Sequence, residues 1–205
     1  MIIEQIYTKC LAQGAYYIES DGEAAVIDPL RAPSPYIERA KKNMAKVKYV
    51  FETHIHADFV SGHIDLAKKT GATIVFGPNA KTQYDCHNAV DGEVFKIGKL
   101  CLKVIHTPGH TLESVSYLLI DAAGNNHALF SGDTLFIQGC GRVDLPGSNS
   151  EDMFHSLRKL SKLPDETIIY PGHNYGPKES ESLEKVKEIN SYLRIEELEL
   201  WKQIM

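Results

Sequence analysis

The chain has 205 residues, of which 43% are hydrophobic and 24% charged, a composition typical of a protein that folds around a core. This length predicts one domain, residues 1–205. The net charge of -5, without a basic stripe, argues against nucleic acid as a partner. The first twenty residues carry Glu4 and Lys9 and no long apolar run, so we expect a cytoplasmic protein without a membrane segment.

The first half of the chain alternates between short strands and helices. A turn at Asp21-Gly22 separates two of the early strands, and Ser61 and Gly71 are candidate caps at the ends of one helix. The pattern predicts strands over 2–7, 15–19, 24–28, 48–53 and 72–76, and helices over 35–44 and 61–70.

The second half begins with strands and ends with helices. We expect strands over 93–97, 100–106, 115–120, 127–130 and 167–170, and helices over 151–160, 179–190 and 195–203. Ser148 stands three residues before Glu151, as in a capping box. Strand-rich halves followed by helices predict an α+β fold in which two sheets pack face to face between helices, a four-layer αββα sandwich.

The densest polar cluster is THIHADF, residues 53–59, where an apolar strand ends. Side chains alternate along an extended chain, so we expect His54 and His56 to point to the same side, with Asp58 following them. Two imidazoles and one carboxylate within five residues indicate a ligand-binding site.

Three further strand ends finish in the same kind of residue. They are TPGHT with His110, SGDT with Asp133 and YPGHNY with His173. Each taken alone is compatible with an ordinary turn, but four such strand ends together indicate one metal site. Imidazole and carboxylate suit Zn, Fe or Mn, and no cysteine occupies a ligand position, so we expect an open catalytic site and not a structural zinc.

In this order, THIHADF, TPGHT, SGDTLF and YPGHNY resemble the metallo-β-lactamase superfamily over nearly the whole chain. GDTLFIQGCGRVDLPG and YPGHNY resemble both glyoxalase II-type hydrolases and persulfide dioxygenases, whereas ETHIHADFVSGH and PGHTLESVSYLL resemble the persulfide dioxygenases more specifically. The hydrolase pattern THxHxDH ends in a histidine that binds a second metal. Phe59 stands there, and its ring cannot ligate, which favours a single metal.

The resemblance implies one Fe(II) per chain, held by His54, His110 and Asp133, with zinc as the alternative metal. Two imidazoles and a carboxylate on one face leave three positions open for oxygen chemistry. His56 is expected as a displaceable fourth ligand or as a hydrogen-bond donor. Asp58 and His173 are expected to orient ligands or bound water.

Three further residues are candidates for catalytic support, each with a structural alternative. Arg142, in GCGR, would bind the anionic persulfide or a carboxylate of its carrier, or would form a salt bridge. Tyr170 would donate a hydrogen bond to metal-bound water, or would belong to the core. Cys140 would itself be oxidised or sulfurated, or would be a buried cysteine between two glycines.

The activity implied is oxidation of the terminal sulfur of a low-molecular-weight thiol persulfide, such as glutathione persulfide, by O2 to sulfite and thiol. One alternative is a zinc-dependent hydroxyacylglutathione hydrolase of the glyoxalase II type, and another is a non-catalytic metal-binding module. The expected partners are the persulfide and O2, with a separate sulfurtransferase and a second copy in a homodimer as further candidates.

Overall fold

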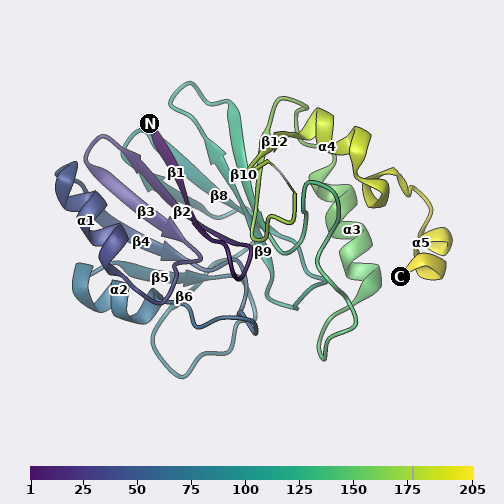
Figure 1. Ribbon diagram of the computed structural model, residues 1–205, viewed down its shortest axis with the longest axis horizontal. Helices are drawn as coiled ribbons and strands as arrows, with labels where there is room; N and C mark the ends of the chain where they lie inside the picture. The colour runs from purple at the N-terminus through teal and green to yellow at the C-terminus, as the bar shows by residue number, and fades with distance from the viewer. Residues whose placement is uncertain (177) are drawn as a thin grey trace.

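The computed structural model describes residues 1–176 and 178–205 and contains two β-sheets that face each other (Figure 1). The first sheet has the order β1 (Ile2–Thr8), β2 (Gln13–Ser20), β3 (Glu23–Ile27), β4 (Lys46–Phe51), β5 (Thr73–Phe76) and β6 (His87–Asn88). The second has the order β12 (Glu181–Ser182), β11 (Ile168–Pro171), β10 (Asn126–Gly132), β9 (Val115–Ile120), β8 (Leu100–His106) and β7 (Val94–Ile97).

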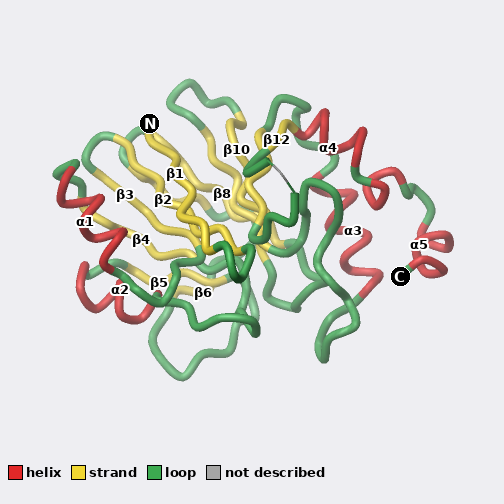
Figure 2. The backbone as a smooth tube through the Cα atoms, in the orientation of Figure 1, coloured by secondary structure: helices red, strands yellow, loops and turns green. Residues whose placement is uncertain are grey.

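Helices cover the outer face of each sheet (Figure 2). Helices α1 (Ser34–Lys42) and α2 (His63–Thr70) pack on the first sheet. On the second sheet lie α3 (Ser150–Leu160), α4 (Leu183–Ile189), α5 (Leu198–Ile204) and a 3-10 turn (Ser191–Arg194). The predicted α+β four-layer αββα sandwich is confirmed. Among the described residues, no helix combines the length and apolar character that a membrane crossing requires.

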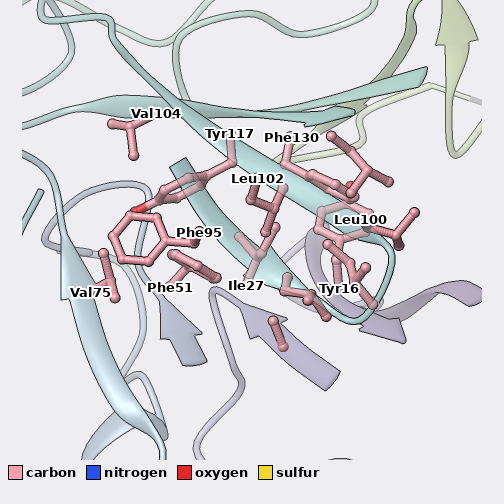
Figure 3. Close-up of a cluster of buried hydrophobic side chains, with 14 of the residues drawn as sticks. Tyr16, Ile27, Phe51, Val75, Phe95, Leu100, Leu102, Val104, Tyr117 and Phe130 are labelled. Carbon is pink, nitrogen blue, oxygen red and sulfur yellow. The ribbon is translucent and has the colours of Figure 1, made fainter. Parts of the chain in front are cut away.

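The central core fills the space between the two sheets (Figure 3). Strand β2 shows how alternation divides its side chains: Tyr16 and Ile18 face the second sheet, whereas Ala15 and Tyr17 pack under the outer helices. Because both faces of β2 are covered, the whole strand is buried. The edges of this rigid pair of sheets carry the loops that contain the polar motifs.

Several element boundaries differ from the sequence predictions. Helix α2 begins at His63 with Gly62 in the cap position, because the Ser61 hydroxyl donates to Glu52 Oε1 at 2.5 Å, with the Pro29 carbonyl oxygen 3.1 Å away. Asn149, and not Ser148, caps α3, since its Oδ1 accepts from the Asp152 amide at 3.0 Å. Residues 181–182 pair with β11 as β12, which delays the start of α4 to Leu183.

Candidate metal centre

The strand-end motifs bring His54, His110 and Asp133 together after β4, β8 and β10. Each residue offers one ligand atom, and these atoms lie within 4.8 Å of one another. His54 is 2% exposed, so its ring is presented from a fixed and dry position. This set of two buried imidazoles and one partly buried carboxylate fits a divalent metal such as iron or zinc.

The hydrogen bonds around His54 decide which of its nitrogens can ligate. The Thr53 hydroxyl donates its only proton to Asp28 Oδ2 at 2.8 Å. Its oxygen therefore accepts from His54 Nδ1, which lies 3.0 Å away. The proton of neutral His54 is consequently on Nδ1, and the lone pair is on Nε2. Burial, helped by the nearby His56, lowers the pKa of His54 to about 3, which keeps the ring neutral.

His110 is oriented in the same way by a different partner. Its Nδ1 lies 2.9 Å from the carbonyl oxygen of Arg142, an atom that can only accept, so Nδ1 carries the proton. The other nitrogen, Nε2, lies 3.7 Å from Asp133 Oδ2. Both histidines thus leave Nε2 free, with the opposite nitrogen held by the protein, as in most metal-binding histidines.

His173 and Asp58 form a hydrogen-bonded chain that ends on Asp133. His173 Nδ1 lies 2.9 Å from Asp133 Oδ1, and its Nε2 lies 2.9 Å from Asp58 Oδ2. Burial opposes a charge on His173, but the bonds to these two carboxylates outweigh it and raise the pKa of the ring to about 10. The hydrogen bond from His173 in turn lowers the pKa of Asp58. Both nitrogens of His173 are therefore engaged.

Glycines next to these ligands allow the backbones to approach closely. A Cβ on Gly172 would lie 2.6 Å from Asp133 Oδ1, and one on Gly132 would lie 2.6 Å from Thr53 Oγ1. Gly132 also has a φ of +50°, which residues with side chains seldom adopt. The glycines beside the ligand residues in the sequence are thus required by the packing of the site.

His56 lies beside His54, but its ring faces a different set of residues. The two ring centroids lie 4.1 Å apart, but His56 Nε2 faces Asp28 Oδ1 at 3.1 Å and Glu52 Oε2 at 3.2 Å. Strand β4 ends at Phe51, so the alternation of an extended chain does not reach residues 54–56. The Phe59 ring packs on His56 with centroids 4.3 Å apart.

Asp28, Glu52 and His63 belong to this arrangement although the sequence analysis did not single them out. His63 Nδ1 lies 3.2 Å from Glu52 Oε1, and its Nε2 lies 2.6 Å from the Tyr84 hydroxyl. With His56, the carboxylates of Asp28 and Glu52 also lie close enough to be a candidate ligand group. Asp28 and Glu52 could have been found in the sequence, because each directly follows a strand and the predicted ligand residues also come after strand ends.

A cavity of about 550 Å³ opens beside the triad, and its lining includes His110, Asp133 and His173. Arg142 lines it too, with an exposed guanidinium that donates to both oxygens of Asp144, at 2.7 and 2.8 Å. An adjoining cavity of about 440 Å³ shares Phe136, His173 and Tyr175 with the first. The site therefore has room for a substrate that extends beyond the reacting atoms.

The other two residues predicted to support catalysis, Cys140 and Tyr170, differ in whether they line a cavity. Cys140 lines the first cavity, and burial raises the pKa of its thiol to about 12. Tyr170 packs in the core between the sheets, where its ring stacks on Phe130 at 5.4 Å and meets Tyr16 edge-on at 5.5 Å. Among the described residues, Tyr170 is not part of the lining of either cavity.

Comparison with known proteins identifies the class of this fold and site. The family model of the metallo-β-lactamase superfamily matches residues 9–173, and the chain belongs to that superfamily. A cytoplasmic hydroxyacylglutathione hydrolase of Arabidopsis thaliana is 36% identical over 181 residues, which are 85% of this chain and 69% of the relative. The chain spans only 60% of the hydroxyacylglutathione hydrolase of Rhizobium etli.

Two solved structures resemble the chain over most of its length. A metallo-beta-lactamase from Staphylococcus aureus is 36% identical with a TM-score of 0.91, and the match covers 98% of this chain and 65% of that one. ETHE1 from Myxococcus xanthus is 31% identical with a TM-score of 0.85, and the match covers 93% of this chain and 84% of that one. Enzymes of this superfamily bind metal ions, and the chain contains residues suited to that role.

Proposed function

We propose that the protein is a mononuclear, Fe(II)-dependent persulfide dioxygenase. The observation that carries the proposal is Phe59, which stands where the hydrolase pattern has a histidine that would hold a second metal. Asp58 and His173 are hydrogen-bonded to each other and would offer a second metal one nitrogen ligand fewer than the full pattern does. His54, His110 and Asp133 then form one ligand set of the type associated with non-haem iron.

Bound Fe(II) would supply an open coordination face at which a sulfur anion and O2 can react. His54 and His110 would hold it through Nε2, and Asp133 would hold it through the oxygen that His173 does not occupy. The overall reaction consumes one persulfide anion, O2 and water, and yields thiol, sulfite and one proton. The reaction needs no strong general base, so holding the two reactants close together would supply much of the rate.

The cavities support a substrate built of a persulfide on a larger carrier. The terminal sulfur would lie beside the triad, and the carrier would extend past Phe136 and Tyr175 into the adjoining cavity. An anionic group of the carrier would share the Arg142 guanidinium with Asp144. A separate sulfurtransferase and a homodimer belong to the same proposal.

The second candidate is a zinc-dependent hydroxyacylglutathione hydrolase, and the curated relatives favour it. They carry that name and are similar to most of this chain. Such an enzyme activates water between two metals. Here the second metal would depend on Asp58, His173 and a shared Asp133, and would require His173 to give up its present hydrogen bonds.

The two candidates are separated by one pair of assays on the same preparation. Protein purified anaerobically is loaded with iron or with zinc, and O2 uptake with glutathione persulfide is compared with hydrolysis of lactoylglutathione. We expect O2 uptake by the iron form and little thioester cleavage by either form. Two bound zinc ions with rapid thioester cleavage, and no O2 uptake, would overturn the proposal in favour of the hydrolase.

A further inference from the structure

We propose that Glu52, together with Asp28, holds His56 away from the metal and so makes the site selective for iron over zinc. The inference rests on the proposed single-metal function and deepens it. Glu52 would be a positioning residue, acting on the metal only through His56.

Glu52 has little freedom to move. It is 1% exposed, and its Oε1 accepts from the Ser61 hydroxyl at 2.5 Å and faces His63 Nδ1 at 3.2 Å. Its other oxygen, Oε2, faces His56 Nε2 at 3.2 Å. Because the Ser61 hydroxyl holds Oε1 and the side chain is buried, Oε2 stays directed at His56.

Asp28 reaches the same nitrogen from another strand end. Its Oδ1 accepts from the Thr53 amide at 2.7 Å and its Oδ2 from the Thr53 hydroxyl at 2.8 Å. Oδ1 also lies 3.1 Å from His56 Nε2. The backbone of Asp28 has a φ of +48°, in the left-handed region that aspartate adopts more readily than most residues with side chains.

His56 is thus near the triad, but its Nε2 faces two carboxylates at ion-pair distance, without a well-aligned hydrogen bond to either. Its side chain is 4% exposed, and its ring is 4.1 Å from that of His54 between centroids. Two imidazoles with one carboxylate occur in both Fe(II) and zinc sites, whereas a third imidazole would add a nitrogen ligand of the kind found in three-histidine zinc sites. Holding His56 on Glu52 and Asp28 therefore keeps a third imidazole from the metal and disfavours zinc.

The test is a Glu52→Gln variant, which removes the charge but keeps the shape. Metal competition on the purified apoprotein gives the ratio of zinc to iron affinity, and X-ray absorption on the zinc form gives the number of histidine ligands. We expect the ratio to rise about tenfold and one histidine to be added. Glu113→Gln is the matched control, because Glu113 is also buried but its Oε1 accepts from the Ile55 amide at 3.0 Å.

A double-mutant cycle with His56→Ala shows whether Glu52 acts through His56. The effect of Glu52→Gln should disappear in the His56→Ala background, and His56→Ala alone should leave iron affinity unchanged. An unchanged metal ratio in folded Glu52→Gln, an equal rise without His56, or a marked loss of iron affinity in His56→Ala would overturn the inference.

These readouts need no turnover, so they separate the inference from the proposed function. Absence of O2 uptake with the expected shift in metal preference would reject the dioxygenase alone. If Glu52→Gln does not fold, the iron affinity of His56→Ala still tests whether His56 is outside the ligand set.

Discussion

Two histidine–carboxylate clusters lie side by side, and their imidazoles are oriented by different kinds of partner. In the triad, His54 and His110 each donate a hydrogen bond from Nδ1 to a protein acceptor, which leaves Nε2 free. In the neighbouring cluster, His56 directs Nε2 at Asp28 and Glu52, which are both 1% exposed. Both clusters draw on the same THIH segment, so residue type alone does not define a ligand.

The difference between the clusters lies in what faces each imidazole. A carbonyl or a hydroxyl that accepts from Nδ1 fixes the ring and leaves a lone pair on the other nitrogen. A pair of carboxylates on one nitrogen favours a protonated ring instead. Burial opposes that charge on His56, but Asp28 and Glu52 outweigh it and raise its pKa well above the usual value.

The largest effect is expected from removing a ligand of the triad. His110→Ala should lower metal affinity by more than about 100-fold, beyond the loss typical of residues that only support ligands. Metal content after dialysis measures this, with circular dichroism as a check that the variant is folded. If His110→Ala retained a full complement of metal, the triad would not be the binding site.

A smaller loss is expected when the support of His54 is removed. Thr53→Val leaves His54 Nδ1 and Asp28 Oδ2 without the hydroxyl between them. Metal affinity should fall about 10- to 100-fold, and unfolding free energy should fall by about 1–3 kcal/mol. Thr53→Ser keeps the hydroxyl and should restore both. Equal affinities for the valine and serine variants would show that this hydroxyl does not orient the ring.

Phe59→His tests why the second site is incomplete. An imidazole at position 59 adds a nitrogen ligand beside Asp58, so zinc binding should rise toward a second equivalent per chain. The substitution should not increase O2 uptake, and Phe59→Leu serves as the control for loss of packing on His56. Zinc stoichiometry identical in the wild type and Phe59→His would contradict the role given to Phe59.

The smallest effect concerns Cys140, which lines the cavity of the triad. Because burial raises its pKa to about 12, the reactive thiolate is scarce near pH 8 and increases only as the pH approaches that value. Iodoacetamide at pH 8 should therefore modify the exposed Cys10 and leave Cys140 unmodified, as peptide mass spectrometry would show. Rapid modification of Cys140 would return it to the catalytic candidates.

Much of the fold followed from local patterns in the sequence. The strands over 100–106 and 115–120 have the predicted bounds, and Gly71 ends α2 with a φ of +74° as expected of a C-cap. The short strands β6 and β12 were missed because each has two residues and depends on pairing with a neighbouring strand. No local periodicity exists over such a length.

The candidate site was predictable as a set of residues but not as a set of contacts. His54, His110 and Asp133 come together because their strands end at one edge, which the order of the motifs already indicated. The direction of His56 depends on Asp28 from a distant strand end and on a chain that is no longer extended after Phe51. The contact of His56 Nε2 with Asp28 therefore comes from a residue distant in the sequence, and no local sequence pattern predicts it.

The most direct test of a single-metal dioxygenase is an anaerobic titration of apoprotein with Fe(II), followed by the rate of O2 uptake with glutathione persulfide. We predict that the rate rises linearly and reaches its plateau at about one iron per chain. A plateau at two irons per chain would contradict the account. It would require a second metal beside Asp58 and His173, where Phe59 replaces the histidine that such a metal needs.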